Sequence, residues 1–250
     1  MTGTDPLTGR LALVTGGSSG IGAATVRCLA EAGASVAIGY HSGADRAAAL
    51  AESLPGGGHF PIRLSLDETE TIDAARAEIA ARGDKLDILV NSAGYTQPVP
   101  HADLQVMDDD LFGRILLANA RGPFSVIRRM LPALRAAGDA VVVNVSSISA
   151  FTGSGSNIAY CAAKAALDTM TMSLARAFGP EVRFLCVSPA AVATDFVAGR
   201  DRAALEKGAD STPLGRVVEP EDVAMAIMAC VTHLKTATGT RIVIDGGRHL

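Results

Sequence analysis

The chain has 250 residues, of which 48% are hydrophobic and 19% charged, and its formal net charge is −4. This length is enough for one large domain, residues 1–250, with a substantial core, and no Pro/Gly/Ser-rich stretch is long enough to be a linker. The 22 basic residues are scattered apart from the Arg128-Arg129 pair. We therefore expect no nucleic acid as a partner.

The spacing of the cysteines and histidines bears on the cellular compartment and on whether the protein binds a metal. The four cysteines form no Cys-x-x-Cys pair, and the five histidines are equally dispersed. This favours free thiols in a reducing compartment and predicts no metal site. The first residues lack the basic and apolar regions of a signal peptide, and the apolar runs are too short to cross a membrane. We expect a cytoplasmic protein without a membrane partner.

Short apolar runs alternate with longer amphipathic stretches along the chain. Runs typical of strands lie at about Leu11–Thr15, Ser35–Gly39, Phe60–Leu64, Leu86–Asn91, Ala140–Val145, Val182–Val187 and Thr240–Ile244. Helical patterns lie at about Ile21–Ala32, Asp45–Leu54, Glu68–Ala81, Asp108–Ala137, Ile158–Phe178 and Pro220–Val231. Such alternation predicts an α/β fold, a single doubly wound domain whose parallel sheet is covered by helices on both faces.

A glycine-rich segment, Thr15 to Gly22, joins the first strand to the first helix. Its glycines permit a tight turn and a close backbone approach, and the helix behind it offers unpaired N–H groups to a pyrophosphate. The segment predicts a dinucleotide cradle, with a simple strand-to-helix turn as the alternative. The cofactor contacts expected in the cradle are Gly16, Ser18, Ser19, Gly20, Ile21 and Gly22.

The end of the second strand bears on the choice of dinucleotide. An acid there would bond both ribose hydroxyls and repel a 2′-phosphate. The segment is Gly39-Tyr40-His41-Ser42, and Asp45 more plausibly lies at the start of the next helix, where acids also act as caps. We therefore expect NADP to be favoured over NAD, with Tyr40, His41 and Ser42 close to the adenosine ribose.

The segment Asn91-Ser92-Ala93-Gly94 directly follows another strand. Its small residues would let a flat cofactor lie close to the backbone, and the Asn91 side chain could tie adjacent strands together. These features predict cofactor contacts at Asn91, Ala93 and Gly94. A plain strand-to-loop turn explains the segment equally well.

Ser147, Tyr160 and Lys164 are the candidate catalytic residues. Tyr160 and Lys164 are one helical turn apart, and Ser147 follows the apolar strand Ala140–Val145. Reduction of a carbonyl needs a proton for the developing alkoxide, and a nearby ammonium lowers the tyrosine pKa from its usual value of about 10. Ser147 would hydrogen-bond the carbonyl oxygen. The alternative is a solvated Tyr/Lys face of a surface helix.

Asn119 is a fourth candidate because of the proline that follows it. Pro123 has no N–H, so the Asn119 carbonyl loses its usual helical partner and is available to water. Such a water could relay protons between Lys164 and solvent. The alternative is a purely structural kink.

These motifs together resemble the short-chain dehydrogenase/reductase family over essentially the whole chain. Further matching segments are Ser188-Pro189, Pro213-Leu214-Gly215-Arg216, Pro220 to Ala224 and Asp245-Gly246-Gly247. The resemblance implies a Rossmann-type fold with a seven-stranded parallel sheet, and an Asn-Ser-Tyr-Lys tetrad of Asn119, Ser147, Tyr160 and Lys164. It also implies that Lys164 bonds the nicotinamide ribose and that the protein is commonly a homotetramer.

The resemblance also assigns residues that chemistry alone does not. It places cofactor contacts at Pro189, Val192 and Thr194, followed by a mobile substrate lid at about residues 194–212. Ser65 and Leu66 would take the adenine-side contacts, although the acid usual there is replaced by Ser65, with Asp67 displaced by two positions. Two other departures are Ala190, where glycine is usual, and Ser92, where asparagine is usual.

The expected activity is hydride transfer between a nicotinamide and a ketone, aldehyde or secondary alcohol of modest size. The similarity extends to 3-oxoacyl-carrier-protein reductases, which gives one alternative for the substrate. A non-catalytic dinucleotide-binding or regulatory protein is the alternative from another class, and the intact tetrad argues against it.

Overall fold

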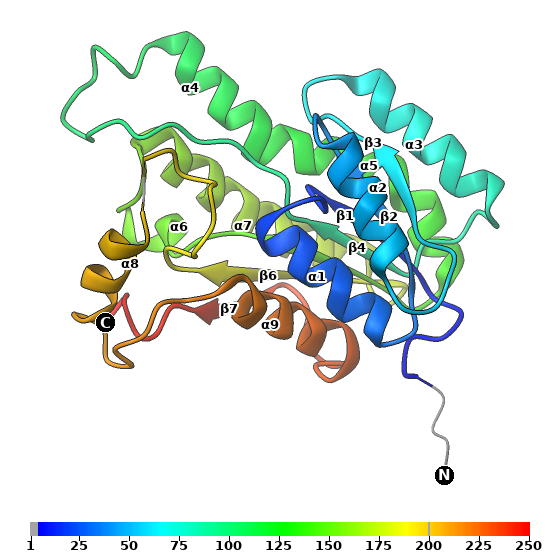
Figure 1. The fold of residues 1–250 in the computed structure, drawn as a ribbon. Coiled ribbons are helices and arrows are strands. Elements are labelled where there is room, and N and C mark those ends of the chain that lie inside the picture. The colour runs from blue at the N-terminus through cyan, green and yellow to red at the C-terminus, as the bar shows by residue number, and fades with distance from the viewer. Residues whose placement is uncertain (1–4, 200) are drawn as a thin grey trace.

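The computed structural model describes residues 5–199 and 201–250. Seven parallel strands form one sheet in the order β3-β2-β1-β4-β5-β6-β7 (Figure 1). The strands are β1 (Leu11–Thr15), β2 (Ser35–Tyr40), β3 (Phe60–Arg63), β4 (Ile88–Asn91), β5 (Ala140–Val145), β6 (Val182–Pro189) and β7 (Thr240–Ile244). This sheet confirms the expected Rossmann-type α/β fold.

Helices cover both faces of the sheet. They are α1 (Gly20–Glu31), α2 (Ala44–Ser53), α3 (Thr69–Ala81), α4 (Asp109–Leu116), α5 (Gly122–Ala137), α6 (Ser149–Thr152), α7 (Ile158–Phe178), α8 (Arg202–Ala209) and α9 (Pro220–Thr232), with a π-helix, η1 (Leu117–Arg121), between α4 and α5. Figure 1 shows α1 and α9 in front of the sheet. Every residue of β5 is buried, because helices pack on both of its sides.

Alternate residues along the strands point to opposite faces of the sheet and pack into two separate cores. Val14 and Val143 face the core that the sheet shares with α1, α2 and α9. Leu13 and Val142 face the core under α3, α5 and the end of α7. The sheet is thus a buried middle layer, and its polar chemistry is confined to the strand ends.

The strand order reverses between β1 and β4, which pair with each other although two strands separate them in sequence. Their outgoing loops therefore diverge to opposite faces of the sheet and leave a crevice at its carboxyl edge. The glycine-rich segment follows β1, and Asn91 ends β4. The topology thus brings two of the predicted motifs to one place.

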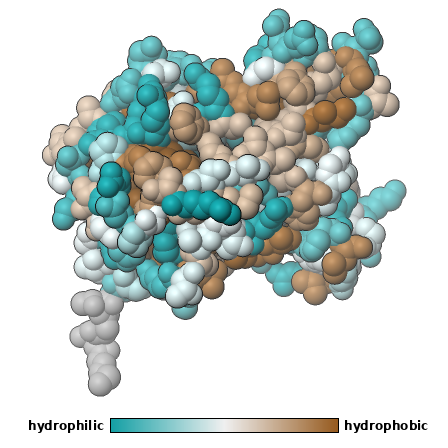
Figure 2. Space-filling model, turned by 180° about the vertical axis from the view of Figure 1, so that it is seen from behind, coloured by the Kyte–Doolittle hydropathy of each residue, from teal (hydrophilic) through white to brown (hydrophobic). Residues whose placement is uncertain are grey.

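The surface carries apolar side chains as well as polar ones. In the view from behind, apolar areas interrupt the hydrophilic surface (Figure 2). Large exposed apolar side chains include Phe124 on α5 and Met172 on α7. Among the described residues, no helix is long and apolar enough to cross a membrane.

The stretch expected to be helical, Asp108–Ala137, is helical from Asp109 to Ala137, but it is not one regular α-helix. Asp108 caps α4, with its side chain accepting from the Leu111 N–H at 2.8 Å, but the helix gives way to η1 at Leu117. The Gly122 N–H donates to the Leu117 carbonyl five residues back. Because Pro123 cannot donate to Asn119, the wider π-type turn replaces the kink that the sequence predicts.

Two short helices lie where none is expected. The helix α6 follows strand β5, and α8 lies inside the stretch expected to be the lid. The Asp201 side chain caps α8 by accepting from the Ala204 N–H at 2.8 Å. Position 200 of the expected lid is outside the described residues.

Candidate active site

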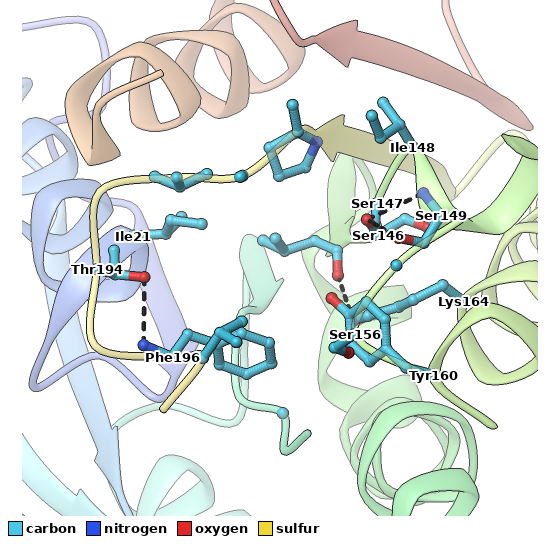
Figure 3. A pocket seen from close by; sticks show the side chains of 18 of the residues that line it. Ile21, Ser146, Ser147, Ile148, Ser149, Ser156, Tyr160, Lys164, Thr194 and Phe196 are labelled. Carbon is cyan, nitrogen blue, oxygen red and sulfur yellow. Dashed lines mark hydrogen bonds between the residues drawn. The ribbon is translucent and has the colours of Figure 1, made fainter. Parts of the chain in front are cut away.

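A cavity of about 350 Å³ opens at the carboxyl edge of the sheet. Of the residues expected at the site, eight line this cavity: Ile21, Gly94, Ser147, Tyr160, Lys164, Pro189, Val192 and Thr194. Figure 3 shows Ser147, Tyr160 and Lys164 on one side, with Ile21, Thr194 and Phe196 across the opening. The structure thus brings together three of the four candidate catalytic side chains.

Local hydrogen bonds position Tyr160 and Ser147. Asn157 begins α7 and its side chain accepts from the Tyr160 N–H at 2.7 Å, which fixes the first turn of the helix. The buried Ser147 hydroxyl donates to Ser149 Oγ at 3.1 Å and accepts from the Ser149 N–H at the same distance. The Ser147 hydroxyl and the backbone of Tyr160 are therefore held in place at the cavity wall.

Lys164 is only 5% exposed, and its ammonium donates to the Val145 carbonyl at 2.9 Å. The ammonium lies 5.4 Å from the centre of the Tyr160 ring, as expected for residues one helical turn apart. Burial lowers the pKa of Lys164 to about 8, against the opposing attraction of Cys186 and Asp168. At neutral pH the ammonium is still charged, so it can favour the Tyr160 phenolate.

Asp168 supplies negative charge one turn behind Lys164. It is 7% exposed, and its Oδ2 lies 3.2 Å from Arg241 Nη1. Because burial raises the pKa of the Cys186 thiol far above neutrality, that thiol is uncharged at neutral pH. Asp168 is therefore the negative charge that helps to keep Lys164 protonated.

A buried polar chain ties the catalytic strands together. Asn91 Nδ2 on β4 donates to Asn144 Oδ1 on β5 at 2.9 Å, and Asn144 Nδ2 donates to Thr171 Oγ1 on α7 at 2.9 Å. The Thr15 hydroxyl accepts from the N–H groups of Ser92 and Ala93 at 3.1 Å each. The strand-tying role predicted for Asn91 is confirmed, and the loop after β4 is anchored to β1.

Asn119 lies in η1 and is completely buried. Its Nδ2 donates to the carbonyls of Tyr95 and Ile115, at 2.6 and 2.9 Å. Its Oδ1 is buried without a hydrogen-bond partner among the residues that the structure describes, and a Cβ added at Gly94 would come within 2.6 Å of it. Asn119 is not among the residues that line the cavity, so its water-holding role stays a prediction.

The glycine-rich segment leaves backbone space that side chains would fill. A Cβ at Gly22 would lie 2.2 Å from the Gly16 carbonyl oxygen, and one at Gly16, whose φ is +64°, would lie 3.0 Å from Ala93 Cα. The helix α1 begins at Gly20 after Ser19. Its first N–H groups have no acceptor within the helix and can bind an anion. The segment therefore fits a dinucleotide pyrophosphate.

At the adenosine end, the structure adds a residue that the sequence analysis missed. Tyr40 ends β2, and His41 and Ser42 follow it as exposed residues. A Cβ at Gly43 would meet Arg46 Nη2 at 2.6 Å and Ser18 Oγ at 2.8 Å, so these two groups converge. The Arg46 guanidinium makes no hydrogen bond or ion pair with another described residue, whereas Asp45 lies in the first turn of α2 as expected.

The third strand ends at a hydroxyl rather than an acid. The buried Ser65 hydroxyl donates to Asp67 Oδ1 in a short hydrogen bond, and this bond holds the pKa of the Asp67 carboxyl below its usual range. Leu66 lies beside this pair, and its carbonyl accepts from Arg121 at 3.2 Å. Asp67, the acid displaced by two positions, is thus hydrogen-bonded to Ser65, which stands where the acid is usual.

The same region contains a group of residues with metal-ligand chemistry. Ligand atoms of His41, Asp67 and Glu68 lie within 4.8 Å of one another. His41 and Asp67 are exposed, and Glu68 is paired with Arg63 at 2.8 Å. The sequence analysis did not predict this group, because His41 is far from Asp67 and Glu68 in sequence. Exposed groups of this kind occur commonly without a metal.

The stretch after β6 forms the wall opposite the catalytic residues. Pro189 ends β6, and the Ala190 N–H donates to the Ile244 carbonyl at 3.1 Å, so alanine fits at this position without loss of strand pairing. Thr194 lies against Gly20, where an added Cβ would be 3.1 Å from Thr194 Cγ2. Phe196 lies across the cavity opening, with its ring centre 6.0 Å from that of Tyr160 (Figure 3).

Comparisons with known proteins decide the family. A family model described as enoyl-(acyl carrier protein) reductase matches residues 16–249. A solved structure from Brucella melitensis, named a short-chain dehydrogenase/reductase and glucose/ribitol dehydrogenase, superposes with a TM-score of 0.91, at 27% identity over 99% of this chain and 100% of that one. The chain belongs to the short-chain dehydrogenase/reductase family.

Other family members are more similar in sequence. The cis-4-hydroxycyclohexanecarboxylate dehydrogenase of Sinomonas cyclohexanicum is 35% identical over 95% of this chain and 96% of that protein. The 3-oxoacyl-[acyl-carrier-protein] reductase of Aquifex aeolicus is 34% identical over 96% and 98%. The protein is therefore a short-chain dehydrogenase/reductase, an oxidoreductase that acts on CH–OH or C=O groups with a nicotinamide dinucleotide.

Proposed function

We propose that this short-chain dehydrogenase/reductase interconverts a small ketone or aldehyde and the corresponding alcohol, with NADP as its preferred dinucleotide. The observation that carries the proposal is the convergence of Ser147, Tyr160 and Lys164 on one cavity beside the glycine-rich segment. When bound, the nicotinamide supplies a hydride to the carbonyl carbon or accepts one from the alcohol.

The side chains of the cavity manage the proton and the charge on oxygen. Tyr160 gives its hydroxyl proton to the developing alkoxide, and the reverse reaction returns it. Ser147 donates a hydrogen bond to the same oxygen, which requires its hydroxyl to turn away from Ser149 Oγ. Lys164 stabilises the phenolate by its charge and holds the nicotinamide ribose, while Asn119 holds water on the route to solvent.

Arg46 supports the preference for NADP. Its guanidinium converges with Ser18 Oγ beside Gly43, and the chain has no acid in the segment from Tyr40 to Gly43 at the end of β2. Guanidinium groups bind phosphates through charge-assisted hydrogen bonds, so Arg46, Ser18, His41 and Ser42 would receive the 2′-phosphate. NAD remains the second cofactor to be compared directly.

The cavity volume favours small substrates. The same 350 Å³ must accept the nicotinamide and the substrate, and its walls combine hydroxyls with apolar side chains such as Ile148 and Phe196. A cyclic hydroxy acid, as named for the Sinomonas cyclohexanicum relative, and a 3-oxoacyl thioester, as named for the Aquifex aeolicus relative, are the specific substrates to test.

Two further properties belong to the proposal. We expect a homotetramer, because β7 is an edge strand with no fully buried residue and Phe124 and Met172 expose apolar surface. We expect a cytoplasmic location, which the free thiols of all four cysteines fit. Light scattering on the purified protein would measure the assembly.

The test is a panel of carbonyl compounds and alcohols assayed with NADP(H) and with NAD(H). We expect turnover, and we expect Tyr160→Phe to lower it about 10²- to 10⁴-fold while dinucleotide binding survives. No turnover with either dinucleotide would overturn the proposed activity.

The cofactor preference is tested by titrating each dinucleotide. NADP should bind more tightly than NAD, and Arg46→Ala should weaken NADP about tenfold or more with little effect on NAD. Tighter binding of NAD to the wild-type protein would overturn the preference.

A further inference from the structure

The charged residues that line the cavity, among those the structure describes, are all basic. Lys164 and Arg248 line it, and no aspartate or glutamate is among its lining residues. Lys164 is buried at the catalytic end, whereas Arg248 comes from the C-terminal segment after β7. The mechanism above uses Lys164 and leaves Arg248 without a role.

The C-terminal segment is built to hold Arg248 in place. Asp245 is 6% exposed, and its carboxylate accepts from the N–H groups of Gly247 and His249 at 2.9 Å each and contacts His249 Nδ1 at 2.7 Å. Burial alone would raise the pKa of Asp245, but these hydrogen bonds outweigh it and hold the pKa below its usual range. The His249 ring also packs edge-on against Phe151 of α6, at 5.8 Å between ring centres.

Only one nitrogen of the Arg248 guanidinium makes a hydrogen bond with another described residue. Its Nη1 donates to the Gly208 carbonyl of α8 at 3.2 Å, and Gly208 leaves it room, since an added Cβ would lie 3.0 Å from that nitrogen. Within residues 5–199 and 201–250 it makes no ion pair with a carboxylate. The remaining N–H groups are therefore available to a ligand.

The cavity wall near Arg248 is rich in hydroxyls. The residues of this wall are Ser149, Thr152, Ser154 and Ser156, and all four line the cavity together with Arg248. Thr152 donates its hydroxyl proton to the Ile148 carbonyl at 3.0 Å, and Ser156 is hydrogen-bonded to Thr96 at 2.6 Å. The Arg248 guanidinium and the hydroxyls of Ser149 and Ser154 are therefore the donors that this part of the cavity offers to an anion.

A neighbouring, smaller cavity differs in the charge of its lining residues. It has a volume of about 130 Å³ and lies between α8 and the C-terminal segment, with Arg248 shared between the two cavities. Its other arginine, Arg216, is paired with Asp222 at 2.9 Å, and Asp245 also lines it. Of these two cavities, the one that contains the proposed catalytic residues is therefore the better match for an anion.

We propose that the substrate of this enzyme carries an anionic group, a carboxylate or a phosphate, which Arg248 and the hydroxyl wall bind while its carbonyl or alcohol group lies at Tyr160. This inference rests on the proposed function. It names the substrate class that the proposed function leaves open, and it assigns Arg248 as the residue that determines the specificity.

The test uses two matched pairs of probes with the preferred dinucleotide. They are 4-oxopentanoate with 4-oxopentanamide, and dihydroxyacetone phosphate with dihydroxyacetone. Each is assayed as a substrate and as an inhibitor of the best neutral carbonyl compound of the panel. We expect the anionic member of one pair to exceed its neutral partner about ten- to a hundredfold in kcat/KM or in inhibition, mainly through KM. The pair that shows the preference identifies the anionic group.

Variants show whether Arg248 causes the preference. Arg248→Gln should bring the ratio of anionic to neutral member close to one, and Arg248→Lys should restore part of it. Arg216→Gln is the matched control and should keep the wild-type ratio. A wild-type ratio near one in both pairs, or an equal loss for both members in Arg248→Gln, would overturn the inference. If neutral carbonyl compounds turn over in that case, the proposed function stands without it; if nothing turns over with either dinucleotide, the proposed function itself fails.

Discussion

Replacement of Lys164 by methionine should separate the stability of this protein from its activity. Methionine keeps most of the length of the side chain and removes the buried charge. We expect Lys164→Met to lose hydride transfer while its folded state, without a dinucleotide, becomes more stable at pH 7. The reason is that the native fold holds an ammonium that is only 5% exposed.

The size of the effect follows from the lysine pKa. Burial lowers it from 10.5 to about 8, a value that already includes the attraction of Asp168. At about 1.4 kcal/mol for each pH unit, the charged side chain costs about 3 kcal/mol of folding free energy at pH 7. Loss of the hydrogen bond to the Val145 carbonyl lowers the free energy of unfolding of the variant by about 1 kcal/mol. We therefore expect a net gain of about 2 kcal/mol.

The pH dependence has a definite sign. Because the pKa of Lys164 is lower in the folded protein than in the unfolded chain, the unfolded chain binds more protons between about pH 8 and pH 10.5. The wild-type free energy of unfolding should therefore gain from this group as pH rises through that window. By pH 9.5 the cost has fallen to about 1.5 kcal/mol, so wild type and Lys164→Met should be nearly equally stable.

Urea unfolding at pH 7 and pH 9.5, followed by far-ultraviolet circular dichroism, measures both differences. Lys207→Met, at an exposed position on α8, is the control and should change the free energy of unfolding by less than about 0.5 kcal/mol at either pH. A Lys164→Met protein that is no more stable than wild type at pH 7 would refute the reasoning. So would a difference that stays constant between the two pH values.

Two other outcomes follow from the site. Gly22→Ala should weaken dinucleotide binding at least tenfold in a fluorescence titration, because its Cβ would lie 2.2 Å from the Gly16 carbonyl oxygen. Gly113→Ala is the control, because a Cβ added there meets no atom of a neighbouring element within 4 Å. Equal dinucleotide affinities of Gly22→Ala and the wild-type protein would contradict the role of the glycine-rich segment in binding. Asp168→Asn should move the alkaline limb of the pH–rate profile to lower pH, because loss of the carboxylate lets the pKa of Lys164 fall further below about 8. An unchanged limb would show that Asp168 does not act through Lys164.

Much of the fold could be predicted because local pattern and burial agree. Strands such as Ala140–Val145 are buried throughout, so they are continuous apolar runs with clear ends. Tyr160 and Lys164 could be placed together because helix geometry fixes neighbours one turn apart. Ser147 could be added because parallel strands end at one edge of a sheet.

What could not be predicted depends on contacts between distant segments. Arg46 meets Ser18 only because α2 folds back beside the glycine-rich segment, and no local pattern shows this. Arg248 lines the cavity because Asp245 and Phe151 fix the C-terminal segment. The helix α8 was missed because it has only eight residues, with Leu205 as its one large apolar side chain, and because its position suggested only a lid.

The π-helix η1 also sets the rotational phase between two helices. Leu111 and Ile115 of α4 pack against Ala159 of α7, whereas Val126 and Met130 of α5 belong to the core under the sheet. Each residue turns an α-helix by about 100°, so the one extra residue of a π-type turn rotates α4 by about that angle relative to α5. One continuous α-helix could not direct both apolar stripes to their present partners. The turn that accommodates Pro123 is therefore also what allows α4 to lie over α7, beside Tyr160.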